Sequence, residues 1–171
     1  ATGVLRLACG CQGKVLVFDP VAGGEALLVI DVDTGALEVF TDPATGAPRL
    51  ACGVNMEDSD SDSDSEPSGE VRVFDPVAGG EALIVLDGHK GKVTALTAFR
   101  DPATGELRLV SSGDKTVRVW NPAASGAAIE AEPEGHSKKV GALVTFLDPA
   151  TGALRVATGS WDEIRVWDAE T

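Results

Sequence analysis

Two histidine–aspartate pairs are the residues of this chain whose types best fit catalysis. His89 and His136 are the only histidines in the sequence, and each follows a glycine and precedes an aspartate, Asp114 or Asp162. A histidine–aspartate pair with a nearby serine or threonine can activate that hydroxyl as a nucleophile. Because the same glycine–histidine setting recurs, we expect both histidines to be structural and the chain not to be an enzyme.

Three cysteines, Cys9, Cys11 and Cys52, could bind a metal through their thiolates. Their number is odd and none forms a Cys-x-x-Cys pair, so neither a disulfide framework nor a zinc site is favoured. Cys9 and Cys52 occupy equivalent places in a repeat, and Cys9 and Cys11 would face the same side of a strand, so a three-thiolate site stays open. The simpler expectation is three buried free thiols that pack as small apolar groups.

An acidic tract at residues 57–66 alternates aspartate with serine between two glutamates. The like charges repel one another, and a segment of this composition cannot bury apolar surface, so we expect disorder there. A plain solvated loop, a docking or regulatory segment for a basic partner, and a calcium site all stay open. Calcium is weakly indicated, because the tract lacks the glycine and the final glutamate of a calcium loop. The candidate partner contacts are Asp58, Asp60, Asp62, Asp64 and Glu66, and the interleaved serines look phosphorylatable.

The composition narrows the partners that this chain could bind. It has 171 residues, 43% hydrophobic and 24% charged, which is typical of one globular domain. The net charge of −13 disfavours nucleic acid and anionic membranes and favours basic proteins or peptides. No apolar run of about 18 residues and no signal pattern occurs, so we expect a soluble protein of the cytoplasm or nucleus. Reduced thiols fit the same compartments.

A repeated phrase organises the elements that must position these residues. Asp-Pro-Ala-Thr-Gly stands complete at 42–46, 101–105 and 148–152, and its last three letters open the chain. The aromatic residues that close the four repeats are 56, 46 and 47 residues apart. They are Phe18, Phe74, Trp120 and Trp167. The acidic tract supplies the surplus in the longer repeat, so the underlying period is regular.

Each repeat reads as a set of short strands. Apolar residues alternate or run briefly between turns rich in glycine, proline and aspartate, and no helical period of adequate length appears. The strictest alternation is at 71–74, 117–120 and 164–167, where one strand face is apolar. Four antiparallel strands per 46 or 47 residues are the unit of a β-propeller blade.

The chain at this point resembles the WD-repeat family of β-propellers. The residues that support the resemblance are Gly88-His89 with Asp114 and 117–121, and Gly135-His136 with 157–162 and 166–168. The last two repeats match well, and the first two are degenerate.

The resemblance implies a buried cluster of histidine, hydroxyl residue, turn aspartate and tryptophan that ties an edge loop to the third strand of its blade. The last repeat would supply His136, Thr158, Asp162 and Trp167. The repeat before it would supply His89, Asp114 and Trp120, with Val110 where the hydroxyl residue is expected. The first two repeats lack the histidine and would depend on apolar packing.

The ends of the chain predict an incomplete ring. The expected strands number three, four, four and three, so the first blade lacks its innermost strand and the last lacks its outermost. Joining the two ends would crowd them, and an open stack exposes apolar faces and strand edges. Either further blades of a longer propeller or other copies of the chain would then cover the ends, and we favour the first.

We therefore predict an all-β chain, a single partial β-propeller domain over residues 1–171 with about three and a half to four blades and an insertion at 54–70 in the second blade. Its expected function is a non-catalytic scaffold that binds a protein or basic peptide through the loop rim, with Trp161 as a further exposed contact. The alternative is a self-associating module that completes a ring with other copies or other blades. We expect no cofactor, metal, nucleic acid or membrane partner.

Overall fold

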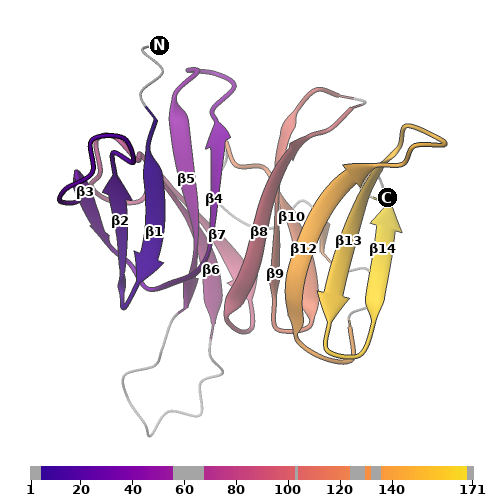
Figure 1. Cartoon of the computed structure of the whole chain (residues 1–171). Coiled ribbons are helices and arrows are strands. Elements are labelled where there is room, and N and C mark those ends of the chain that lie inside the picture. The colour runs from indigo at the N-terminus through magenta and orange to yellow at the C-terminus, as the bar shows by residue number, and fades with distance from the viewer. Residues whose placement is uncertain (1–4, 56–67, 103, 124–129, 132–135, 169–171) are drawn as a thin grey trace, which may run out of the picture.

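Fourteen β-strands and no helix make up the part of the chain that the structure describes. The computed structural model describes residues 5–55, 68–102, 104–123, 130–131 (backbone only) and 136–168. The strands form four antiparallel sheets (Figure 1). In chain order they are β1 (Leu7–Cys11), β2 (Lys14–Phe18), β3 (Leu28–Asp31), β4 (Thr34–Thr41), β5 (Pro48–Asn55), β6 (Gly69–Phe74), β7 (Ile84–His89), β8 (Val93–Arg100), β9 (Leu107–Gly113), β10 (Thr116–Trp120), β11 (Glu130–Ala131), β12 (Val140–Leu147), β13 (Leu154–Ser160) and β14 (Ile164–Asp168).

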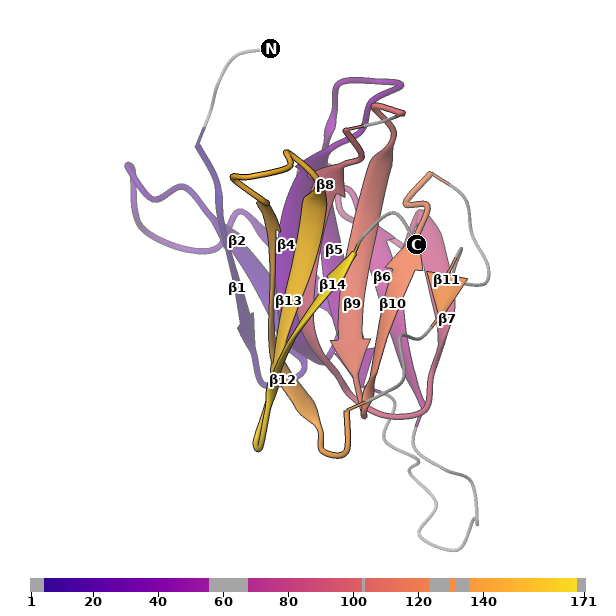
Figure 2. The ribbon, with the colours of Figure 1, turned by 90° about the vertical axis from the view of Figure 1, so that its right-hand side faces the viewer.

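Each sheet is a meander in which consecutive strands pair, as a propeller blade requires. The four blades contain β1–β3, β4–β7, β8–β11 and β12–β14, so the predicted strand counts and the predicted all-β fold are confirmed. The ring is not closed. Figure 1 shows the first blade and the fourth blade at opposite sides of the molecule, and Figure 2 looks onto the fourth.

The hydrophobic core lies between neighbouring blades, where three clusters of buried side chains join one blade to the next. One repeat position faces the preceding blade and is occupied by Leu50, Leu109 and Val156. Another faces the following blade and is occupied by Val15, Val71 and Val117. Burying one such side chain stabilises the fold by roughly 1.5–3 kcal/mol. The blades are therefore held to one another by the same contact, repeated.

The phrase Asp-Pro-Ala-Thr-Gly forms the same tight turn in each place. In the first, the Thr45 hydroxyl donates to Asp42 Oδ2 at 2.7 Å, and the Gly46 N–H donates to the Asp42 carbonyl oxygen at 2.8 Å. Gly46 has a φ of 69°, a left-handed value that glycine adopts without strain. The recurring phrase thus fixes the turn between β4 and β5, and its copies fix those between β8 and β9 and between β12 and β13.

The predicted insertion is narrower than its expected bounds of 54–70. Val54 and Asn55 belong to β5, Gly69 and Glu70 belong to β6, and Asn55 pairs with Gly69 across the two strands. The backbone ladder therefore extends into the predicted segment from both sides. Residues 56–67 lie outside the described residues.

Candidate functional site

The first polar cluster joins the second blade to the third. His89 ends β7, and its Nε2 lies 2.7 Å from the hydroxyl of Ser111 in β9. The indole Nε1–H of Trp120 in β10 donates to the same hydroxyl oxygen at 2.7 Å. Thr116 Oγ1 lies 3.3 Å from the other ring nitrogen of His89. Ser111 therefore bridges the histidine and the tryptophan.

The hydroxyl position in this cluster differs from the prediction. Val110 was expected there, and that prediction is wrong, because Ser111 makes both contacts. Backbone register explains the difference. Ser111 pairs with Arg118 and Thr158 pairs with Arg165, so both hydroxyl residues stand nine positions before their tryptophan.

The turn aspartate Asp114 binds backbone rather than the imidazole. It has a φ of 50°, and its carboxylate accepts N–H groups from Lys90 at 2.9 Å, from Thr116 at 2.7 Å and from Lys115. These bonds tie the β9–β10 turn to the residue that follows His89. Asp114 thus holds the loop in which the histidine sits, and Thr116 makes the contact with the ring.

The second polar cluster repeats this plan in the fourth blade. His136 Nε2 lies 2.7 Å from the Thr158 hydroxyl, and Trp167 Nε1–H donates to that hydroxyl oxygen at 2.8 Å. Asp162, like Asp114, binds the residue that follows the histidine: its carboxylate accepts the hydroxyl of Ser137 at 2.6 Å. It also accepts the hydroxyl of Ser160 at 2.7 Å. The two serine contacts hold the pKa of Asp162 below its usual range.

Sequence reasoning missed Glu163, which approaches the second histidine. Its Oε1 lies 3.2 Å from His136 Nδ1, although the two atoms are not aligned for a hydrogen bond. Arg165 Nε lies 2.8 Å from the same oxygen, and this contact with the guanidinium is the main cause that lowers the pKa of Glu163. Counting back from the tryptophan would have found it, because Glu163 and Thr116 both stand four residues before theirs.

Burial fixes the protonation state of the first histidine. His89 is 2% exposed, and loss of hydration lowers the pKa of its imidazole to about 4, against the opposing attraction of Asp114. The ring is therefore neutral near pH 7. The contacts fit one tautomer, in which Nδ1–H donates toward Thr116 and Nε2 accepts the Ser111 hydroxyl proton. The Ser111 hydroxyl donates its proton to His89, and its oxygen accepts the indole N–H of Trp120, so this hydroxyl is poorly placed to attack a substrate.

Cys9 and Cys52, in the first and second blades, occupy the position that Ser111 and Thr158 hold in the others. Cys52 is buried, and burial raises the pKa of its thiol to about 12. Cys9 and Cys11 are exposed, so the prediction that they are buried is wrong. Their side of β1 has no neighbouring blade, whereas the first blade covers Cys52. No group of three or more candidate metal ligands occurs among the described residues, and the three thiols do not form one site.

The candidate partner contacts divide between described and undescribed segments. Trp161, in the turn between β13 and β14, is 89% exposed. Figure 1 shows this turn at the same edge of the molecule as the β9–β10 turn and the ends of β5 and β6. Asp58, Asp60, Asp62, Asp64 and Glu66 lie outside the described residues.

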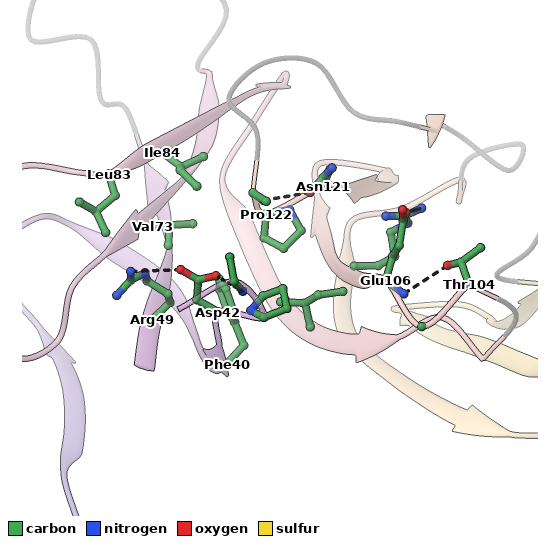
Figure 3. Close-up of a pocket in the computed structure, with 16 residues that line it drawn as sticks. Phe40, Asp42, Arg49, Val73, Leu83, Ile84, Thr104, Glu106, Asn121 and Pro122 are labelled. Atoms are coloured by element: carbon green, nitrogen blue, oxygen red, sulfur yellow. Dashed lines mark hydrogen bonds and ion pairs between the residues drawn. The ribbon is translucent and has the colours of Figure 1, made fainter. Parts of the chain in front are cut away.

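A cavity that the sequence did not reveal opens at the opposite rim, between the second and third blades (Figure 3). Its volume is about 610 Å³, and its walls combine apolar side chains with charged ones. Phe40, Val73 and Leu107 are among the apolar lining residues, and Arg49 and Arg108 are the two cations. The recurring Leu-Arg-Leu and Asp-Pro phrases supply part of this lining, which is the signal that could have indicated it.

Comparisons with known proteins agree with the architecture. The family model of the WD domain, G-beta repeat, matches residues 80–121, which span β7 to β10 and include the first cluster. The fold is similar to a chain of the crystal structure of a mitotic checkpoint complex, with a TM-score of 0.50 and 20% identity. The match covers 98% of this chain and 60% of that one. No curated protein matches the sequence. Among the described residues, no helix is suited to crossing a membrane. The resemblance to the WD-repeat family is confirmed.

Proposed function

We propose that this chain, with a WD repeat on propeller-type blades, is a non-catalytic scaffold that binds a protein or basic peptide through the rim of its glycine–histidine loops. A WD repeat in such a fold is typical of protein-interaction scaffolds. The observation that supports the proposal most is that both polar clusters are closed. Each histidine is 2% exposed, and its hydroxyl partner also holds the tryptophan. Their chemistry is used within the fold, and the exposed loops are left for binding.

The position of the acidic tract supports a basic partner. The tract runs between Asn55 and Gly69, which pair with each other, and Gly69 also pairs with His89. The described residues that flank the tract therefore lie at the histidine rim. The net charge of −13 adds a long-range attraction for cations. Trp161 would supply an apolar contact on the same rim.

Neutralising the tract is expected to weaken binding of an octalysine peptide on the order of tenfold at low salt, because four exposed charge pairs are lost. The variant changes Asp58, Asp60, Asp62 and Asp64 to Asn, and the measurement is calorimetric titration at several salt concentrations. The matched control changes the four interleaved serines to alanine, which keeps every charge. Equal affinity of the two variants, or binding that does not depend on salt, would contradict the role of the tract.

A second candidate function, self-association through the end blades, is favoured by one observation. Val15, Val71 and Val117 are buried by the following blade, whereas Ile164 at the same repeat position is 79% exposed. At the other end, Leu7 is half exposed although its counterparts in the other blades are buried. Exposed apolar patches of this kind are typical of surfaces that associate. Other copies of the chain or further blades would cover them.

Replacing Ile164 and Val166 by aspartate is expected to leave the chain monomeric at micromolar concentration, because two charges would have to be desolvated in the contact. Sedimentation equilibrium should show the unchanged chain as a larger species under the same conditions. Val77→Asp is the matched control, since Val77 is an exposed valine away from the end faces. A monomeric unchanged chain would exclude association between copies.

A further inference from the structure

An arginine–aspartate pair recurs at the rim opposite the histidines. The arginine lies in the Leu-Arg-Leu phrase or its variant, and the aspartate directly follows the closing aromatic residue. Arg6 Nη1 lies 3.5 Å from Asp19 Oδ2, and Arg49 Nη1 lies 3.6 Å from Asp75 Oδ2. Arg155 Nη1 contacts Asp168 Oδ2 in the same way. In three blades, therefore, the same nitrogen of the guanidinium meets the same oxygen of a carboxylate.

The third blade breaks this pattern at one residue. Asn121 stands where the others have aspartate, and its Oδ1 still accepts the N–H of Ala123 at 2.9 Å, as Asp19 Oδ1 accepts that of Val21 at 2.9 Å. The amide nitrogen Nδ2 therefore corresponds to the oxygen that meets arginine in the other blades. The third blade thus has a hydrogen-bond donor, Asn121 Nδ2, where the other three blades have an acceptor oxygen. The Arg108 guanidinium of the same blade is a second donor.

Arg108 has a weaker substitute for the missing carboxylate. Its Nη2 pairs with Glu106 Oε2 at 2.6 Å, and Glu106 is 61% exposed. The other complete copies of the phrase have alanine at this position, Ala47 and Ala153. Among the described residues, Glu106 is the one carboxylate that pairs with Arg108, and the pair is made through Nη2. Glu106 thus balances the charge of Arg108 from an exposed position. Its side chain can rotate away from the guanidinium.

Both donors line the cavity between the second and third blades, together with Phe40, Val73 and Leu107. Asn121, Phe40 and Val73 are labelled in Figure 3. We propose that this cavity binds a carboxylate borne on an apolar group, with the carboxylate held between Arg108 Nη1 and Asn121 Nδ2. Guanidinium–carboxylate bonds are charge-assisted and geometrically specific. The apolar group would lie against the buried wall, and a volume of about 610 Å³ is typical of small-ligand sites. This site goes beyond the scaffold function and lies on the other rim.

The test uses 3-phenylpropionate and its neutral amide as probes, titrated into the full chain by NMR. The acid is expected to bind saturably, with a dissociation constant at or below about 1 mM, and the amide at least tenfold more weakly. Asn121→Asp should reduce acid binding at least tenfold, because the chain's own carboxylate then fills the place, as in the other three blades. Glu106→Ala should increase acid binding severalfold by removing the internal competitor.

Both variants install residues that other repeats of this chain already contain, so thermal melting should show the fold retained. A second arm titrates acetyl-Phe-Glu-amide, which carries the carboxylate on a peptide. Tighter binding of the peptide indicates a segment of a partner protein, and tighter binding of the free acid indicates a small molecule; both support the site. Equal binding of acid and amide, unchanged binding by Asn121→Asp, or no saturable binding up to about 10 mM would overturn it.

Discussion

Replacing Trp120 by alanine is expected to lower the free energy of unfolding by about 3–5 kcal/mol. Trp120 is fully buried between the second and third blades, where it packs with Leu86, Val93 and Leu109. Its removal would leave a large cavity and take away the hydrogen bond that the Ser111 hydroxyl oxygen accepts. Both losses act on the same contact between blades. Urea denaturation followed by circular dichroism measures the change.

The chain supplies a matched control for this experiment in its other tryptophans. Trp161→Ala removes a side chain that is 89% exposed and should change stability by no more than about 0.5 kcal/mol. Trp120→Phe keeps one aromatic ring but loses the N–H donor and part of the buried indole, so about 1–3 kcal/mol is expected. If the alanine variant does not fold, the phenylalanine variant still gives a value. If Trp120→Ala and Trp161→Ala lower the free energy of unfolding equally, the polar cluster around Trp120 does not stabilise the fold.

The free energy of unfolding should rise between pH 4 and pH 6.5 by about 3 kcal/mol because of His89 alone. Burial lowers the pKa of this imidazole from 6.5 to about 4 in the folded chain. Between these values the unfolded chain binds the proton and the folded chain does not, so the proton favours unfolding. The contribution of His89 to stability is therefore complete above about pH 6.5, falls as the pH drops through the window, and is smallest below pH 4.

Two acids with raised pKa values make it necessary to compare two proteins rather than interpret the stability curve of one. Burial raises the pKa of Glu38 and Glu70, so these groups lower the stability as the pH rises. The His89→Gln variant keeps those acids and removes the imidazole. The difference between the two stability curves, each from urea denaturation at several pH values, isolates the histidine. If the curve of the variant runs parallel to that of the unchanged chain, His89 is not the source of the slope.

The repeat phrase predicts most of the fold because strand length, turn type and blade number all follow from local patterns. The alternation at 71–74, 117–120 and 164–167 places β6, β10 and β14. The Asp-Pro-Ala-Thr-Gly turns place the strands on either side of each turn. The count of strands at each end was predictable because every blade repeats the same order. The resemblance to WD repeats also indicated which histidines would be buried.

The parts that sequence reasoning missed depend on register and on neighbours. Val110 was assigned the place of Ser111, and it stands four residues before Asp114 as Thr158 stands four before Asp162. Antiparallel pairing instead places Ser111 opposite Arg118, as it places Thr158 opposite Arg165. Cys9 and Cys11 were expected to be buried because cysteine packs as a small apolar residue, but burial requires a second blade against their side of the strand. The cavity beside Arg108 arises only where two blades meet, so no single repeat predicts it.

The equivalence of the contacts between blades has a consequence for how such a chain can change over evolutionary time. Leu50, Leu109 and Val156 each enter the same kind of apolar surface on the blade before them. Duplicating or deleting one repeat of 46 or 47 residues would therefore create a junction between two surfaces that already fit. The number of blades can change in a single genetic step, without new interface residues, while an individual substitution such as that at Asn121 gives one junction a chemistry of its own.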